Sequence, residues 1–312
     1  MISSAPEGHF SIWRPINDAT LPWPGLFLGA PILGFWYWST NQYIVQRVLG
    51  AKNLKHARRG VLLGGFLKLI PLFIMVIPGA MAISIYQGIE NPDMVYPTIV
   101  LQALPVGLVG LVLAGLISAI MSSVDSTLNS SSTLIVIDFI KPRKPNITPK
   151  QVANYGRIST LVLMIVAAAW APMIANFGGL WIYLQQMYTI FVPPIVVLFI
   201  IGTFYKRGNA HGAFWTLVYG TIVGLVFFIL VQVGLWSIHF TINAGIVLLL
   251  SVGFFVYFSG RSAPPSAEVL QNFTFRKELI HQENTGSTWY QDYRFWAALL
   301  FVAIAIIFIG LV

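Results

Sequence analysis

A run of oxygen-bearing side chains lies inside one of the most apolar stretches of the chain. Residues 118–133 read SAIMSSVDSTLNSSST, with seven serines, two threonines, an asparagine and an aspartate between the apolar segments VGLVGLVLAGLI and LIVIDFI. On a helix, residues at the spacing i, i+3, i+4 and i+7 share one face. The face defined by this spacing carries Ala119, Ser122, Ser123, Ser126, Asn129 and Ser130.

The chemistry that such a face favours is the binding of a hard cation. Hydroxyl, carboxylate and backbone carbonyl oxygens are the ligands that such a cation prefers, and Asp125 adds a negative charge. We expect sodium, because a transporter must replace the water shell of its ion without binding it irreversibly. The alternative is structural, since small and hydroxyl residues also let transmembrane helices approach closely. That alternative explains neither the density of oxygens nor the aspartate.

Two ionisable side chains, Lys68 and Asp125, lie well inside apolar segments. A charge at the centre of a bilayer costs on the order of 2.5–3.5 kcal/mol on insertion scales, so such residues are candidates for function. The alternative is that they pair with each other, or with a residue of another helix, and only hold the bundle together.

Aromatic and amide side chains follow a segment of glycines and a proline in the first apolar run. Glycine and proline weaken a helix, and broken helices line the solute site of many secondary transporters. Ring faces together with amide groups suit a sugar or a similar polyol. The alternative for the tryptophans is an aromatic belt at the membrane interface, but their position in mid-span argues against it. The weakening residues are Gly25, Gly29, Pro31 and Gly34, and the ring and polar residues are Trp36, Tyr37, Trp38, Thr40, Asn41 and Gln42.

The composition shows which elements must position these residues. Of the 312 residues, 57% are hydrophobic and only 9% are charged, whereas soluble domains carry roughly 25% charged residues. Several apolar runs reach the ~20 residues that a helix needs to cross a bilayer, and the alternation of a transmembrane barrel is missing. We therefore expect an all-α polytopic membrane protein of about eight spans. The predicted spans are 24–46, 61–86, 105–138, 153–176, 179–204, 212–235, 241–259 and 292–312.

Basic residues cluster in four of the predicted loops: 47–59, the loop after the third span, residues 206–207 and the loop 260–291. If the spans alternate, all four lie on one side, which the positive-inside rule assigns to the cytoplasm. Both termini are then extracellular or periplasmic, with residues 1–23 as an extracellular segment. These loops also account for the net charge of +8, so we expect no nucleic-acid partner. The sequence shows no nucleophile–base pair or phosphate-binding loop, so we expect no enzyme.

Two long segments of the sequence resemble the sodium/solute symporter family, and within it the sodium/glucose cotransporters. They are LPWPGLFLGAPILGFWYWSTNQYIVQRVLGAKNLKHARRGVLLGGFLKLIPLFIMVIPG and AGLISAIMSSVDSTLNSSSTLIVIDFI. The resemblance covers nearly the whole chain and implies a LeuT-like fold, with two inverted repeats and a solute site between them. It implies that 24–204 forms the second repeat and 205–312 additional C-terminal helices. The implied function is sodium-coupled symport of a sugar or polyol across the plasma membrane, by alternating access.

The resemblance also implies roles for single residues. Ala119 offers a carbonyl oxygen, and Ser122 and Ser123 offer hydroxyls, to the sodium ion that the family shares. Asp125 and Ser126 fall where some members build a second sodium site. The resemblance thus makes sodium the coupling ion.

The solute-binding residues that the resemblance implies are Tyr37, Trp38, Asn41, Lys68 and Gln185. Tyr37 corresponds to the family's inner-gate tyrosine, beside Trp38, and Lys68 to its substrate-binding lysine. Two positions depart from the glucose cotransporters, because Gly34 replaces a hydroxyl residue and Asn41 an acidic one. Both departures argue against glucose itself.

Members of the family also have a first repeat of about five helices, to which the resemblance does not extend. That repeat supplies the remaining sodium ligands and several sugar contacts. We therefore expect this chain to be the C-terminal portion of a longer symporter. The alternatives are a non-transporting remnant or modulatory membrane protein, or a family carrier of another solute such as proline, a vitamin or an anion.

Overall fold

In the computed structural model, the described residues are 11–18, 21–86, 88–89, 91–177, 179–275 and 288–310, and this part of the chain contains helices and loops but no strand. It holds seven helical segments that are long and apolar enough to cross a membrane, one of which, Leu54–Ala82, contains a turn at residues 68–69. These seven match seven of the eight predicted spans. They are Leu54–Ala82, Val106–Arg143, Pro149–Ile174, Leu180–Phe204, Ala210–Gln232, Phe240–Gly260 and Tyr293–Gly310.

The remaining predicted span, 24–46, is a broken helix, as the sequence predicts. It consists of α1 (Trp23–Phe35), the π-helical turn η2 (Trp36–Thr40) and α2 (Gln42–Leu49). Asn41, with φ −71° and ψ 116°, interrupts the helix. The break therefore lies after the glycines and the proline, and Pro31 sits inside α1. The wide turn is closed by the Asn41 backbone N–H, which donates to the Trp36 carbonyl oxygen at 2.9 Å.

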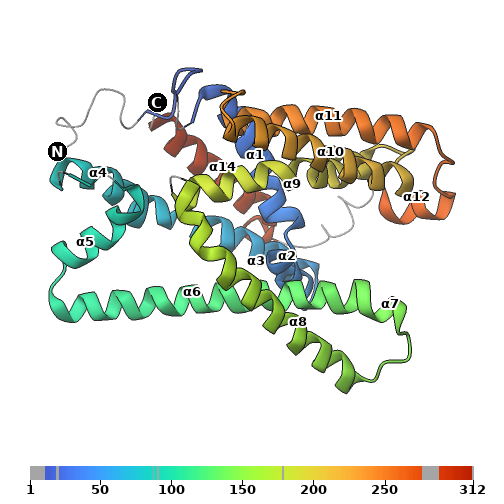
Figure 1. Ribbon diagram of the computed structural model, residues 1–312, viewed down its shortest axis with the longest axis horizontal. Coiled ribbons are helices and arrows are strands. Elements are labelled where there is room, and N and C mark those ends of the chain that lie inside the picture. Colours follow the sequence, from blue (N-terminus) through green and yellow to red (C-terminus); the bar gives the residue numbers. More distant parts are fainter. Residues whose placement is uncertain are drawn as a thin grey trace. The chain divides into compact units, whose positions relative to one another are not determined.

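The chain divides into two compact units, of which the first spans Pro71–Tyr183 in its described part. Its long helix α6 (Val106–Leu134) continues into the π-helical segment η5 (Ile135–Ile140), and α8 (Pro149–Trp170) packs against both, as Figure 1 shows. Its other elements are η3 (Leu72–Val76), α4 (Ile77–Ile85), η4 (Pro92–Met94), α5 (Val95–Ala103), α7 (Lys141–Arg143) and η6 (Ala171–Phe177).

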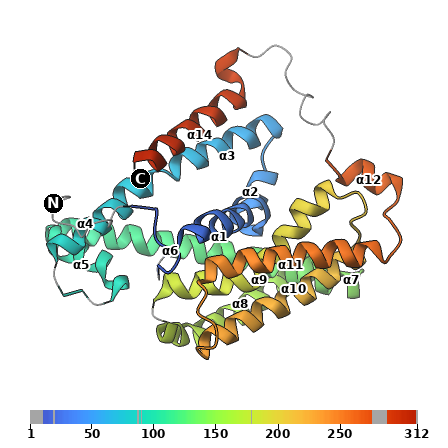
Figure 2. The ribbon, with the colours of Figure 1, turned by 90° about the horizontal axis from the view of Figure 1, so that it is seen from above.

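The second unit consists of Pro6–Ile70 and Leu184–Val312. In it α10 packs along α11, α1 packs on α11, and α14 lies along α3 (Figure 2). Besides α1, η2 and α2, its elements are α3 (Leu54–Leu67), α9 (Leu180–Phe204, from Leu184 on), α10 (Ala210–Gln232), α11 (Phe240–Gly260), α12 (Ala267–Phe273), η7 (Trp289–Gln291) and α14 (Tyr293–Gly310).

Small residues set the packing of α10. Gly212, Thr216, Gly220 and Gly224 follow each other at a spacing of four and are all buried. A Cβ atom added at Gly220 would lie 2.7 Å from the Oγ of Ser251 on α11. In lipid, helices associate through such close backbone approach rather than through the hydrophobic effect.

Asn209 joins the loop before α10 to the end of α11. Its side-chain nitrogen donates to the carbonyl oxygens of Ser259 at 3.0 Å and Ala263 at 3.2 Å. The basic residues 206–207 and Arg261 therefore lie at the same end of the α10–α11 pair. This agrees with the same-side placement predicted for these two loops, and their orientation in a membrane stays a prediction.

The predicted loop 260–291 contains α12 and returns to the end of α9. The backbone N–H of Phe275 donates to the Thr203 carbonyl oxygen at 3.0 Å, and its ring lies 5.3 Å from that of Phe204. Residues 276–287 of this loop, and residues 1–10 and 19–20 of the predicted N-terminal segment, lie outside the described residues.

Candidate functional site

Lys68 lies at the end of α3, with its side-chain nitrogen over the ring of Tyr37. The nitrogen is 5.3 Å from the ring centroid, a distance at which a cation is attracted to an aromatic face. Tyr37 belongs to the π-helical turn just before the break at Asn41. The structure thus brings together two of the five predicted solute-binding residues, and it does so at the broken helix.

Trp38 completes this group from the same turn. Its ring lies edge-on to that of Tyr37 at 5.6 Å between centroids. It also packs over α3, where a Cβ added at Gly64 would lie 3.7 Å from the indole. Because Gly64 is one helical turn before Lys68, the glycine leaves room for the indole beside the lysine.

Two further tyrosines, Tyr43 and Tyr188, belong to this aromatic cluster. The ring of Tyr43 lies 6.3 Å from that of Tyr37, and the ring of Tyr188 on α9 lies 4.9 Å from that of Trp36. Sequence reasoning missed both. In a continuous α-helix, residues six apart face different sides, so only the wide turn and the extended Asn41 bring Tyr43 back to Tyr37.

Gln185 lies on α9, one turn before Tyr188 and Thr189. Its carbonyl oxygen accepts a hydrogen bond of 3.0 Å from the hydroxyl of Thr189. Within the described part of the chain, the side-chain amides of Gln185 and Asn41 make no hydrogen bond. These two predicted solute ligands therefore keep their donors and acceptors for another group, although no described contact joins either of them to Lys68.

The predicted sodium ligands lie on α6, which is an uninterrupted helix from Val106 to Leu134. The spacing argument for one oxygen-lined face therefore holds along the whole segment. Ala119, Ser122 and Ser123 are exposed. Among the described residues, the hydroxyls of both serines have no hydrogen-bond partner, so their oxygens are open to a ligand.

The two residues of the predicted second sodium site differ from each other. The hydroxyl of Ser126 donates to the carbonyl oxygen of Ser122 at 2.8 Å. The exposed carboxylate of Asp125 makes neither an ion pair nor a hydrogen bond with any described residue. An uncompensated carboxylate in a membrane span is costly, which favours a cation beside Asp125.

The predicted sodium ligands belong to the first unit and the predicted solute ligands to the second. Each set is built on the helices of its own unit. One is a row of oxygens on a straight helix, and the other is an aromatic cluster at a broken helix.

These features agree with the comparison with known proteins. The family model described as "Sodium:solute symporter family" matches residues 5–220. This chain belongs to that family. The resemblance stated from the sequence is thereby confirmed, and so is the assignment to an all-helical, multi-pass membrane protein of this family.

The chain is similar to several sodium cotransporters over much of its length. It is 38% identical to human sodium/myo-inositol cotransporter 2 over 305 residues, which are 86% of this chain and 45% of that protein. It is 41% identical to the Bos taurus protein of the same name over 243 residues, and 39% identical to Danio rerio sodium/glucose cotransporter 4 over 236 residues. These two matches cover 72% and 70% of this chain, and 36% of each relative. The chain thus spans less than half the length of these relatives.

Proposed function

We propose that this chain supplies half of the transport machinery of a sodium-coupled symporter for a sugar or polyol in the plasma membrane. The observation that carries the proposal is the group of Lys68, Tyr37 and Trp38 at a broken helix. Broken helices of this kind line solute sites in secondary transporters. Both termini would be extracellular or periplasmic, residues 24–204 would form the second repeat, and 205–312 would add C-terminal helices.

Sodium, as a transported ion, would bind to the oxygen face of α6. The carbonyl oxygen of Ala119 and the hydroxyls of Ser122 and Ser123 suit this role, because hard cations bind to uncharged oxygens as well as to carboxylates. Asp125 and Ser126 would hold a second sodium ion. These three oxygens are fewer than the water molecules that the ion loses on binding, so the remaining ligands would come from another segment.

The solute would lie against the aromatic cluster in the second unit. The Lys68 ammonium has three donors, and the amides of Asn41 and Gln185 each provide both donors and an acceptor. A ring that carries a hydroxyl on most carbons matches this set, with the faces of Tyr37 and Trp38 against its C–H groups. We propose a cyclic polyol such as myo-inositol, which the names of the relatives also support, rather than glucose.

Coupling would arise from mutual stabilisation of one conformation. An ion that favours the outward-open state raises the affinity of that state for the solute, and the solute does the same for the ion. The bend at Asn41 would let the aromatic turn move while α1 and α2 stay helical.

The test is counter-flow of labelled myo-inositol and labelled glucose into proteoliposomes, with and without a sodium gradient. We expect no sodium-dependent uptake by the chain alone, and uptake of myo-inositol in preference to glucose when the unmatched part of human sodium/myo-inositol cotransporter 2 is present as well. Uptake that ignores sodium would contradict the proposal, and uptake of proline instead of polyols would contradict its solute.

A modulatory membrane protein is the second candidate function. It is favoured by the exposure of Ala119, Ser122 and Ser123, because this chain by itself covers none of these predicted ligands. Failure of uptake with the added part, combined with a changed rate in a complete cotransporter, would select this function.

A further inference from the structure

The helices α3 and α14 start at the same end of the second unit. The guanidinium of Arg58, near the start of α3, lies 4.5 Å from the ring centroid of Tyr293, the first residue of α14. Further along, a Cβ added at Gly65 would lie 2.6 Å from a methyl carbon of Leu300. The contact thus advances by seven residues on each helix, so the two helices run parallel. Both begin segments that can cross a membrane, and their starts therefore reach the same membrane surface.

Positive charge gathers at this shared end. Of the described residues in 50–70 and 288–310, Asp292 is the one acidic residue, and its carboxylate accepts a hydrogen bond from the backbone N–H of Arg294 at 2.9 Å. Cations oppose the dipole at the start of a helix, so the basic residues do not serve the stability of α3 or α14. The five basic residues are Lys52, Lys55, Arg58, Arg59 and Arg294.

Two of these cations lie beside one ring. The guanidinium of Arg294 lies 5.8 Å from the centroid of the Tyr293 ring, which Arg58 also contacts. Attraction to the aromatic face holds each guanidinium in place, but two like charges beside one ring repel each other. Lys55 and Arg59 are exposed and share a helix face with Arg58, at the spacing i, i+3 and i+4. A bound anion would offset the repulsion, and the planar fork of a guanidinium suits phosphate oxygens.

Exposed aromatic side chains assign this end to the headgroup layer of a membrane. Trp289, Tyr290 and Trp296 are all exposed. The indole N–H of Trp296 donates to the Tyr290 carbonyl oxygen at 2.8 Å. Tryptophan and tyrosine are enriched where a protein crosses the boundary between membrane and water. The cations therefore lie where lipid headgroups lie.

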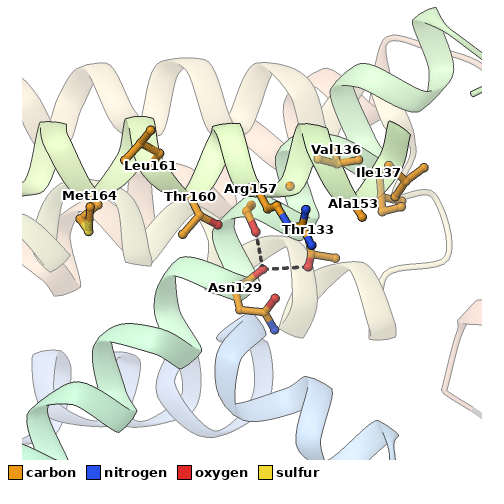
Figure 3. Close-up of a pocket in the computed structure, with 12 residues that line it drawn as sticks. Asn129, Thr133, Val136, Ile137, Ala153, Arg157, Thr160, Leu161 and Met164 are labelled. Carbon is orange, nitrogen blue, oxygen red and sulfur yellow. Dashed lines mark hydrogen bonds between the residues drawn. The ribbon is translucent and has the colours of Figure 1, made fainter. Parts of the chain in front are cut away.

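The groove between α6 with its η5 extension and α8 does not share these features (Figure 3). It has a volume of about 480 Å³ and belongs to the first unit. Its described lining residues include one charged side chain, Arg157, and no aromatic ring. The combination of clustered cations and interfacial aromatic residues thus distinguishes the start of α3 and α14 from this groove.

We propose that the shared start of α3 and α14 binds the phosphorylated headgroup of an inositol phospholipid, with Arg58 and Arg294 on its phosphates. Clusters of about four to eight basic residues beside a membrane span are typical of sites for anionic lipids. A phosphoinositide carries several negative charges on one headgroup and so matches this cluster better than phosphatidylserine, which carries one net charge. The predicted cytoplasmic side of the loop 47–59 is also the side of the anionic leaflet. The proposal goes beyond solute transport and depends on neither the ion nor the solute.

The experiment is native mass spectrometry of the purified chain, released from nanodiscs of phosphatidylcholine with phosphatidylinositol bisphosphate or, in a second set, phosphatidylserine. We expect the bisphosphate lipid to be retained about tenfold better than phosphatidylserine, because it offers more charge to the cluster. Arg58→Gln and Arg294→Gln should each lower its retention about fivefold, which corresponds to roughly 1 kcal/mol. Tyr293→Leu keeps every charge but removes the shared ring, and should lower retention about threefold.

The matched control is Lys206→Gln combined with Arg207→Gln, which removes two exposed charges from another predicted cytoplasmic loop and should leave retention unchanged. Tyr293→Phe keeps the ring and should also retain the lipid, so a loss confined to Tyr293→Leu reports on the ring contact. Equal losses in the control and in the arginine variants would make retention a general effect of basic loops and overturn the site.

Three other results would also overturn the proposal. One is retention of phosphatidylserine equal to that of the bisphosphate lipid, and another is unchanged retention in Tyr293→Leu. The third is binding of soluble inositol trisphosphate as tight as that of the lipid, which would assign the cluster to a free phosphate compound.

Discussion

In α10 and α11 small and hydroxyl residues are buried, whereas the predicted sodium ligands Ser122 and Ser123 on α6 are exposed, although Ser130 and Ser132 further along α6 are buried. Thr216, Ser251 and Ser259 have no accessible surface, but Ser122 and Ser123 are open. These two stripes of residues look alike in the sequence, because small residues recur at helical spacing in both. The difference teaches that a polar stripe acts as packing surface where the chain covers it. Where the chain leaves it open, it is available to an ion or to another helix.

Filling the covered stripe should have the largest effect. Gly224→Ala places a Cβ 2.7 Å from the carbonyl oxygen and 2.8 Å from the Cα of Ile190, and neither backbone atom can move aside easily. We expect a loss of about 2–3 kcal/mol in the free energy of unfolding, as for other overpacked sites. Unfolding in a detergent titration measures it. Gly115→Ala on α6 meets nothing within 4 Å and is the control, and equal losses in the two variants would erase the contrast between the stripes.

Removing the charge from the aromatic cluster should affect solute binding. In a transport-competent assembly, Lys68→Ala loses a cation–π contact and the proposed hydrogen bonds to the solute. We expect the KM for the polyol to rise roughly tenfold, which corresponds to about 1.4 kcal/mol. The half-maximal sodium concentration should change less. The reverse ranking in initial-rate measurements would make Lys68 a structural residue.

Removing one exposed hydroxyl from α6 should weaken the binding of sodium. Ser123→Ala takes away a hydroxyl that no described residue uses, so the fold should be unaffected. We expect the half-maximal sodium concentration for uptake to rise about fivefold, or roughly 1 kcal/mol. Ser131→Ala, on the same helix, should leave it unchanged. Identical sodium dependence in wild type and Ser123→Ala would reject the site.

A change of similar size is expected at a polar contact inside the first unit. A carboxylate oxygen of Asp93 accepts a hydrogen bond of 3.1 Å from the backbone N–H of Leu180, where α9 begins. Asp93→Ala should lower the free energy of unfolding by about 1 kcal/mol, as loss of a helix cap does. Thermal unfolding in detergent measures it. Asp93→Asn, which keeps an acceptor, should lose less than half of that.

The sequence was sufficient to predict the helices, because long apolar runs and basic loops each have a direct physical cause in the membrane. Seven spans agree with the structure within a few residues, except that the second begins at Leu54 rather than at 61. The face of α6 also followed from spacing alone, since α6 is regular. The roles of its residues and those of the solute ligands stay predictions.

The local irregularities could not be predicted from the sequence. Spacing rules assume an α-helix, so they miss Tyr43, which the wide turn at Trp36–Thr40 rotates toward Tyr37. They also place the weak point of the first span at its glycines. Two of these instead pack against Thr241, where a Cβ at Gly29 would lie 2.5 Å from a backbone oxygen.

The clamp formed by Asn209 has a consequence for how the chain enters a membrane. It fastens the segment before α10 to the segment after α11, so the two helices form a hairpin whose open ends stay together. The basic residues 206–207 and Arg261 then act on topology as one group. Inverting the hairpin would require all three charges to be translocated together. The orientation of the two helices in the membrane is therefore set jointly.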